Sequence, residues 1–150
     1  MNMKDERQFV GYSKYRSRLV DGHVHTELCP HGSGDRTALM IEKAIELRIE
    51  KVCLTEHAPL PAGFAAEYGG DKKAYNTASL KLNQVDSYLE LGRQLQRAYG
   101  THIDISLGFE VDYIPGFETD IQEFLDRYGP LTDDNILSVH FMEGLNNAFY

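Results

Sequence analysis

The sequence predicts an α/β fold with about four parallel strands joined by crossover helices. Short apolar segments alternate along the 150 residues with longer segments whose apolar residues recur at helical spacing. Strands and helices that alternate in this way form a parallel sheet with right-handed crossovers, either open or closed into a barrel. The length fits one domain, residues 1–150, and no internal repeat, low-complexity segment or linker divides the sequence.

The first half of the chain predicts a strand, a helix and a second strand. Leu19–His25 is the first strand, because it begins with a β-friendly pair and runs into two histidines. Asp35 is the expected cap of a helix that continues to about Ile49, in which apolar residues recur three or four apart. Lys51–Glu56 is apolar on both faces, as buried strands of parallel sheets are.

The second half predicts the same alternation after a long loop. Ala58–Thr77 is rich in Pro and Gly, and a loop of this length in a compact domain is usually functional or mobile. Ala78–Tyr99 is amphipathic and is followed by Gly100, a helix stop signal. The remaining elements are expected as a strand over Ile103–Val111, a helix over Gly116–Tyr128 and a strand over Asn135–Phe141.

Composition excludes several classes of partner. The formal net charge of −8 argues against nucleic acid or an anionic membrane, since both require clustered Lys and Arg. No apolar stretch approaches membrane-spanning length, and the charged N-terminus precedes no apolar segment. Cys29 and Cys53 form no disulfide framework, which favours reduced thiols. We therefore expect a cytoplasmic protein with no nucleic-acid or membrane partner.

The most informative motif is the pair His23 and His25, with His31 in the Gly- and Pro-rich segment after it. Residues two apart in a strand project to the same face, so both imidazoles can reach one metal ion. The loop that carries His31 can fold back over the same position. One such pair is weak evidence, because a single histidine at a strand end is more often structural than a ligand.

All four predicted strands end in residues of this kind, which strengthens the metal hypothesis. The strand ends carry His23 and His25, then Glu56 and His57, then Glu110 and Asp112, and finally His140. The carboxyl ends of parallel strands meet at one rim, where barrel enzymes place their chemistry. The alternative, unrelated polar residues that close four strands, requires a coincidence. His102 precedes its strand and is expected at the opposite end.

Three further residues near this rim have two interpretations each. Cys29 lies close to the histidines and is either a thiolate ligand or a buried bystander. Asp21 and Glu56 either orient ligand imidazoles from the side of the ring that faces away from the metal or simply cap the ends of their strands.

Five short motifs resemble successive motifs of the PHP phosphoesterases, and among these the histidinol-phosphate phosphatases of the HisJ/HisK type. The motifs are Asp21–Thr26, His31–Gly32, Thr55–Pro59, Gly108–Tyr113 and Ser138–Phe141. The resemblance covers nearly the whole chain. It implies the N-terminal portion of a distorted (β/α)7 barrel, and it makes the chain a single, partial PHP domain.

The resemblance also implies a centre of up to three divalent metal ions, with Zn, Mn or Fe as the metal. By position, His23 and His25 would bind the first ion, and Glu110 would bridge it to a second ion that His140 also binds. His31 and His57 would bind the third ion.

The implied activity is metal-dependent hydrolysis of a phosphate monoester, with L-histidinol phosphate converted to L-histidinol in histidine biosynthesis. A metal-bound hydroxide would attack, with no separate side-chain nucleophile, and the partner would be a small phosphorylated metabolite. Family members continue well beyond a motif like Ser138–Phe141 and add further ligands there. The sequence is therefore expected to be part of a longer enzyme, or to self-associate through an open sheet edge. The alternatives are another small phosphate ester such as a nucleotide, or a truncated, non-catalytic metal-binding remnant.

Overall fold

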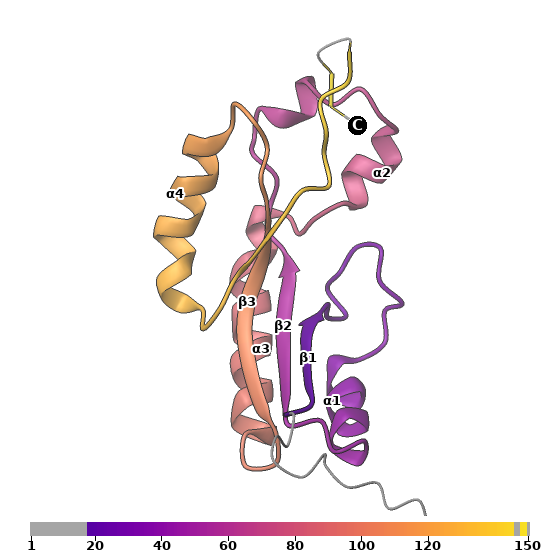
Figure 1. Cartoon of the computed structure of the whole chain (residues 1–150), viewed down its shortest axis with the longest axis vertical. Coiled ribbons are helices and arrows are strands. Elements are labelled where there is room, and N and C mark those ends of the chain that lie inside the picture. Colours follow the sequence, from indigo (N-terminus) through magenta and orange to yellow (C-terminus); the bar gives the residue numbers. More distant parts are fainter. Residues whose placement is uncertain (1–17, 146–147, 150) are drawn as a thin grey trace, which may run out of the picture.

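The computed structural model describes residues 18–145, 148 and 149, which form a curled half-barrel of four parallel strands (Figure 1). The strands are β1 (Val20–Val24), β2 (Lys51–His57), β3 (Asp104–Asp112) and β4 (Ile136–Ser138). Their order in the sheet is the order in the sequence, and every neighbouring pair is parallel. The predicted α/β fold with four parallel strands is therefore confirmed.

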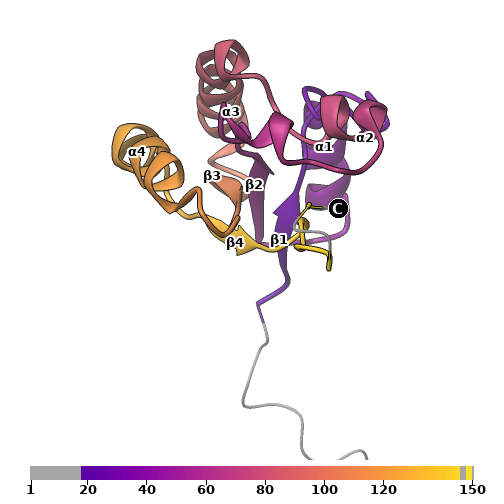
Figure 2. The same cartoon turned by 90° about the horizontal axis from the view of Figure 1, so that it is seen from above.

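The helices are α1 (Thr37–Glu46), α2 (Lys72–Thr77), α3 (Val85–Tyr99) and α4 (Glu118–Tyr128). Helix α2 lies beyond the carboxyl ends of the strands (Figure 1). Figure 2 shows α1, α3 and α4 along the convex face of the sheet, which leaves the opposite face without a helix. Among the described residues, no helix combines the length and the apolar character that crossing a bilayer requires.

The core lies between the helices and the sheet. Leu54 on β2 and Phe109 on β3 are fully buried beneath Ile41 of α1 and Leu89 of α3. Gly92 lets α3 approach β3 closely, because a Cβ at this position would clash with the Leu107 side chain. A second apolar cluster, centred on the ring of Phe64, lies beyond the carboxyl ends of the strands. One apolar cluster thus packs the helices against the sheet, and the second lies at the carboxyl ends of the strands.

Tyr88 of α3 reaches the seam between β2 and β3. Its hydroxyl lies 2.5 Å from the carbonyl oxygen of Gly108 and 3.0 Å from that of Leu54. The same hydroxyl accepts a hydrogen bond of 3.3 Å from the backbone N–H of Glu56. Burial raises the pKa of Tyr88 far above its usual value, so the group stays a neutral donor. One side chain thereby ties together two strands just before their polar ends.

The first helix differs from the expectation at both ends. It starts after Arg36 rather than at a cap by Asp35, whose carboxylate instead accepts a hydrogen bond of 2.9 Å from Ser33. It ends at Glu46, and Arg48 then takes the left-handed conformation with φ of 59°, so the helix does not reach Ile49. The local Ser–Asp turn competes successfully with capping.

The segment predicted as a loop, Ala58–Thr77, holds a single turn of 3-10 helix at Phe64–Ala66 and the short helix α2. Asp71 caps α2 by accepting hydrogen bonds from the backbone N–H groups of the second and third residues after it. The helix predicted from Ala78 begins instead at Val85, after a 3-10 turn.

The later elements shift by a few residues. Gly116, with φ of 88°, precedes the last helix, which starts at Glu118. The last strand covers only Ile136–Ser138, because the side chain of Asn135, rather than its backbone, accepts the bond from the Phe109 N–H at 2.9 Å. The predicted strand Asn135–Phe141 was thus too long at its start. It was also too long at its end, where the backbone N–H of His140 donates to the side chain of Asp112 at 3.1 Å.

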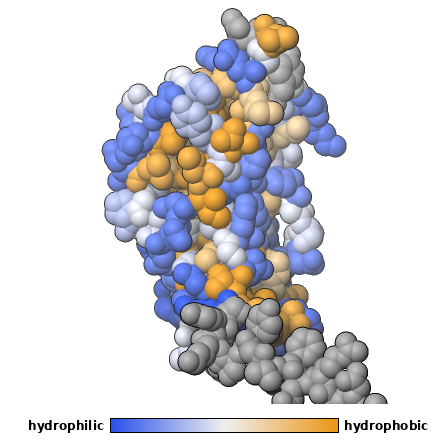
Figure 3. All heavy atoms as spheres, viewed as in Figure 1, coloured by the Kyte–Doolittle hydropathy of each residue, from blue (hydrophilic) through white to orange (hydrophobic). Residues whose placement is uncertain are grey.

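Within the described residues, β4 forms one edge of the sheet and pairs only with β3. Leu137, Val139 and Met142 are 60–70% exposed on and after this strand. Figure 3 shows apolar side chains gathered on the surface in the region of α4 and β4. The expected open sheet edge is present and carries apolar side chains.

Candidate metal centre

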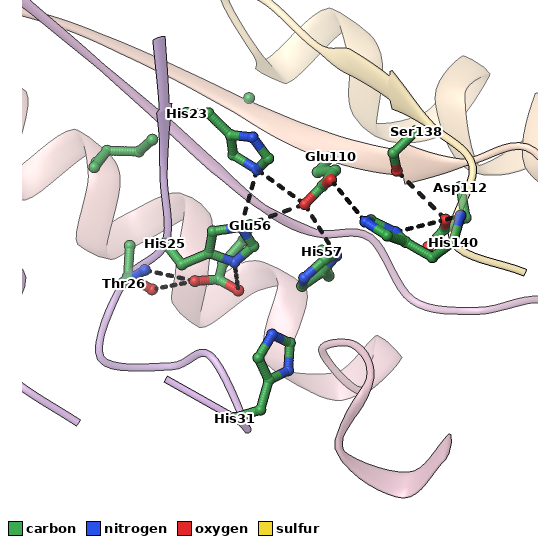
Figure 4. A network of polar contacts seen from close by, with 12 residues as sticks. His23, His25, Thr26, His31, Glu56, His57, Glu110, Asp112, Ser138 and His140 are labelled. Atoms are coloured by element: carbon green, nitrogen blue, oxygen red, sulfur yellow. Dashed lines mark hydrogen bonds and ion pairs between the residues drawn. The ribbon is translucent and has the colours of Figure 1, made fainter. Parts of the chain in front are cut away.

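The candidate ligands come together at the carboxyl ends of the strands (Figure 4). His23 lies in β1 and His25 directly follows it. Glu56 and His57 are the last two residues of β2, and Glu110 lies in β3 opposite His57. His140 follows β4 by two residues. Parallel pairing alone accounts for this convergence, since it brings every strand to an end on the same side.

Glu110 is the centre of the cluster, with only 3% of its side chain exposed. Its Oε2 lies 3.0 Å from His23 Nε2, 3.3 Å from His25 Nε2 and 3.1 Å from His57 Nδ1. Its Oε1 lies 3.5 Å from His140 Nε2. His23 Nε2 and His25 Nε2 are themselves 3.0 Å apart. Four imidazoles therefore direct ring nitrogens at one buried carboxylate.

The charges in this cluster perturb each other. Burial pushes the pKa of Glu110 upward, but the charges of His57 and His23 outweigh it and hold the pKa below its usual value. Burial, together with the neighbouring histidines, lowers the pKa of His57. The carboxylate of Glu56 beside the ring is the main cause that raises the pKa of His25 against its burial. The lowered pKa of His57 favours the neutral ring, the form in which imidazole binds metals.

Asp112 holds His140 in place. Its Oδ1 accepts a hydrogen bond of 3.1 Å from the backbone N–H of His140 and lies 2.9 Å from the Nδ1 of the same ring. Ser138 also donates to this oxygen at 3.4 Å. The contact fixes Nδ1 and leaves Nε2 to face Glu110, an arrangement common behind metal-binding histidines. Sequence reasoning placed Asp112 only at a strand end, although its spacing of two residues from Glu110 indicated a shared face.

Glu56 occupies the corresponding position behind His25. Its side chain is fully buried, and its Oε1 accepts bonds from the backbone N–H and the hydroxyl of Thr26 at 2.6 and 3.0 Å. Its Oε2 lies 3.5 Å from His25 Nδ1. Asp21 differs, because it is exposed and its carboxylate makes no hydrogen bond or ion pair with any residue in the described part of the chain.

The remaining histidines lie where their positions in the chain suggest. His31 is exposed, and its Nδ1 lies 2.7 Å from the carbonyl oxygen of Thr77, the last residue of α2. Its ring centroid is 5.0 Å from that of His57, so it faces the cluster from the loop between β1 and α1. His102 is exposed at the opposite end of the sheet, where its Nδ1 lies 3.0 Å from the Thr101 hydroxyl.

The donor set fits divalent metal ions. Three buried atoms near the cluster make no hydrogen bond: His25 Nδ1, His57 Nδ1 and Glu56 Oε2. In the described part of the chain, no Lys or Arg forms an ion pair with Glu56 or Glu110. Buried charges of this kind require a partner. Three groups of side chains each bring their ligand atoms within 4.8 Å of one another. These groups are His23–His25–Glu110, His25–Cys29–Glu56 and His57–Asp112–His140.

A cavity of about 270 Å³ opens beside this cluster. His57, Asp112 and His140 form its floor, and the rings of Tyr68 and Phe141 form a wall. Ala74 of α2 closes another side. The cavity gives a small ligand access to the imidazoles from the side of the second apolar cluster.

Comparison with known proteins agrees with this architecture. The PHP domain family matches residues 21–150. The histidinol-phosphatase of Bacillus subtilis is 41% identical over 122 residues, which cover 81% of this chain and 44% of that protein. A solved Listeria monocytogenes structure, described as a candidate histidinol phosphatase hisK, superposes with a TM-score of 0.84 at 43% identity. The superposition covers 87% of this chain and 47% of that one.

A second solved structure is the histidinol phosphate phosphatase of Lactococcus lactis in complex with zinc, L-histidinol and phosphate. It superposes with a TM-score of 0.64 at 26% identity, over 83% of this chain and 41% of that chain. The chain thus spans less than half the length of each of these three proteins. Because the family match extends over most of the sequence, from Asp21 onward, this chain belongs to the PHP domain family.

Proposed function

We propose that this chain binds divalent metal ions at the carboxyl ends of its strands and supplies part of the centre of a metal-dependent phosphate monoesterase. One observation carries this proposal. The buried carboxylate of Glu110 faces four imidazoles at 3.0–3.5 Å, and no Lys or Arg in the described part of the chain pairs with it. Such a cluster of acceptors is balanced by cations that the chain itself does not supply.

The proposed ligands follow the distances. His23, His25 and Glu110 hold a first ion, and Glu110 shares a second ion with His140. His57 and His31 hold a third, since their ring centroids lie 5.0 Å apart. Imidazole and carboxylate ligands suit Zn, Mn or Fe, and the Lactococcus lactis relative binds zinc.

When bound, divalent ions at such a centre activate water as a nucleophile and neutralise the oxygens of the phosphoryl group. The protein residues have the task of orientation. Asp112 keeps the Nε2 of His140 directed at the centre, and Glu56 does the same for His25. Glu110 supplies the negative charge that draws the cations together.

The proposed substrate is L-histidinol phosphate, which would be converted to L-histidinol in histidine biosynthesis in the cytoplasm. The names of the Bacillus subtilis and Lactococcus lactis relatives support it. The cavity of about 270 Å³ is suited to a small phosphorylated metabolite rather than a polymer. Another small ester, such as a nucleoside monophosphate, would use the same centre, and relative hydrolysis rates distinguish the two.

A second candidate is a metal-binding chain without turnover. It is favoured by one observation, namely that the second and third ions have only two proposed ligands each among the described residues, whereas zinc sites have three or four protein ligands. The exposed edge of β4 offers a place where a second copy could complete the sheet. Metal binding, self-association and phosphate release therefore have to be measured separately.

The test is the metal content per chain of the purified protein, measured by elemental mass spectrometry together with native mass. Phosphate release from histidinol phosphate and from nucleoside monophosphates is then followed with Zn, Mn or Fe added. His25→Ala should lose metal and any turnover, whereas His102→Ala, at the opposite end of the sheet, should lose neither. Metal without phosphate release supports the second candidate. A protein that takes up no metal contradicts both.

A further inference from the structure

Three side chains next to the proposed centre form a group of different chemistry. His25, Cys29 and Glu56 each direct one ligand atom to a common point, with all three atoms within 4.8 Å of one another. Glu56 is fully buried and Cys29 is 7% exposed. Cys29 and His25 belong to the segment after β1, and Glu56 to the end of β2. The group needs neither Glu110 nor His140.

One oxygen of the Glu56 carboxylate accepts hydrogen bonds and the other accepts none. Thr26 holds Oε1 with two hydrogen bonds, which fixes the plane of the carboxylate. Oε2 makes no hydrogen bond, and neither does the Nδ1 of His25, which faces it at 3.5 Å. A buried carboxylate oxygen and a buried ring nitrogen, both without a hydrogen bond, point to a cation between them.

The position of Cys29 is set by its backbone. Its N–H donates to the carbonyl oxygen of Thr26 at 3.1 Å, and its own carbonyl oxygen accepts from the N–H of Gly32 at 3.1 Å. Gly32 lies so close that a Cβ there would be 3.2 Å from the Cβ of Cys29. Two successive turns thus hold the sulfur near Glu56. Cys53 is equally buried on β2 but belongs to none of the possible ligand groups among the described residues.

We propose that Cys29, Glu56 and the Nδ1 of His25 form an additional site for a thiophilic divalent cation such as Zn²⁺, Co²⁺ or Cd²⁺. A thiolate and a carboxylate together carry two negative charges, which one divalent ion neutralises. On binding to the metal-free chain, the thiol proton leaves to solvent and the proton of the His25 ring resides on Nε2, so that the lone pair of Nδ1 is available to the ion beside Glu56. When Nε2 also holds an ion of the proposed centre, the ring proton too leaves to solvent and the imidazolate ligates both ions. A sulfur ligand selects these metals over Mn²⁺ and Mg²⁺, which prefer oxygen. His25 still presents its Nε2 to Glu110 on the other side of the ring.

The test uses Co²⁺ added to the metal-free 150-residue chain, followed by near-ultraviolet absorption. A thiolate ligand produces a sulfur-to-cobalt charge-transfer band, which imidazole and carboxylate ligands do not. We expect this band in the unsubstituted chain and in Cys53→Ser, and its loss in Cys29→Ser. Affinity for Cd²⁺ should fall by about 10- to 100-fold in Cys29→Ser, while affinity for Mn²⁺ stays unchanged.

Glu110→Gln separates this proposal from the proposed function, because it removes the imidazole-carboxylate centre and should leave the band in place. Cadmium-113 NMR of the unsubstituted chain gives a measurement that needs no variant, since sulfur ligation shifts the resonance strongly downfield. A missing band, a band that survives in Cys29→Ser, or a cadmium resonance typical of nitrogen and oxygen ligands alone would each overturn the additional site.

Discussion

The two ends of the sheet balance their charges in different ways. At the amino end, Arg18 lies 3.0 Å from Asp104 and 3.6 Å from Glu50, and all three side chains are about half exposed. At the carboxyl end, Glu110 and Glu56 are buried almost completely. Their ion-pair partners in the described residues are imidazoles, which are neutral over much of the physiological range.

The two ends differ in whether their carboxylates need a cation that the chain does not supply. The exposed pairs are satisfied by each other and by water, and such pairs contribute little to stability. The buried carboxylates are shielded from solvent and form no ion pair with a Lys or Arg in the described part of the chain. Burying them without a partner costs several kcal/mol per charge, on the order of the effective desolvation penalty of an ion. The carboxyl end is therefore where we propose that cations bind, whereas the amino end is an ordinary surface.

The largest expected effect follows from Glu110→Gln. The amide keeps the shape of the side chain but removes the charge that faces four imidazoles, so metal affinity should fall by more than about 100-fold. Isothermal titration of the metal-free protein with Mn²⁺, which the proposed sulfur-containing site does not select, measures the change. Glu50→Gln at the amino end is the matched control, and we expect it to bind as the unsubstituted protein does. Equal losses in both variants would mean that net charge, not the cluster, attracts the metal.

The cluster at the carboxyl end could be predicted from the sequence because it depends on one rule. Parallel strands end on the same side, so residues after four strands converge whatever the exact strand limits. His140 shows this, since it reaches Glu110 although β4 ends two residues before it.

Helix α2, which contributes Ala74 to the cavity beside the cluster, could not be predicted in the same way. Helix α2 has no apolar periodicity, and the Asp71 cap that starts it resembles any Asp in a loop. The contact between His31 and the carbonyl oxygen of Thr77 depends on that helix and therefore could not be predicted from the sequence. Asp35 shows the reverse error, because its carboxylate engages Ser33 instead of capping α1. At both Asp71 and Asp35, the structure depends on which nearby hydrogen-bond donor the carboxylate engages. The spacing of apolar residues carries no information about that choice.

Tyr88→Phe tests how much the hydroxyl that joins β2 and β3 contributes to the stability of the protein. The variant keeps the buried ring but removes the hydroxyl that contacts Glu56, Leu54 and Gly108. We expect the free energy of unfolding to fall by about 1–3 kcal/mol, measured with urea on the metal-free protein. Tyr128→Phe is the control, since Tyr128 is also buried but its hydroxyl makes no hydrogen bond in the described part of the chain. Similar losses in both would show that ring packing alone matters.

The pH dependence of the metal-free protein tests the contact between His25 and Glu56. The folded pKa of His25 is raised from 6.5, so its stabilisation is fully present below pH 6.5 and is lost as the pH rises through the folded value. The lowered pKa of His57 acts with the opposite sign, because protonation of the unfolded chain near pH 6.5 favours unfolding.

Comparison of the unsubstituted protein with Glu56→Gln isolates the first effect. The stability that Glu56 adds should be about 1 kcal/mol greater at about pH 5 than at about pH 9, as measured by urea unfolding. The effect is modest because the two atoms are 3.5 Å apart. A difference that grows with pH would contradict the assigned direction of the His25 shift.

The smallest effect is expected at the amino end, for Arg18→Gln. The variant removes the charged group that contacts Asp104 and Glu50, yet all three side chains are about half exposed, and water and salt screen their attraction. The free energy of unfolding should change by less than about 0.5 kcal/mol, and the difference should vanish at high salt. Metal content should not change at all, because the sheet separates Arg18 from Glu110. A clear loss of metal in this variant would mean that the two ends are coupled, and that the charge balance of the carboxyl end extends through the whole sheet.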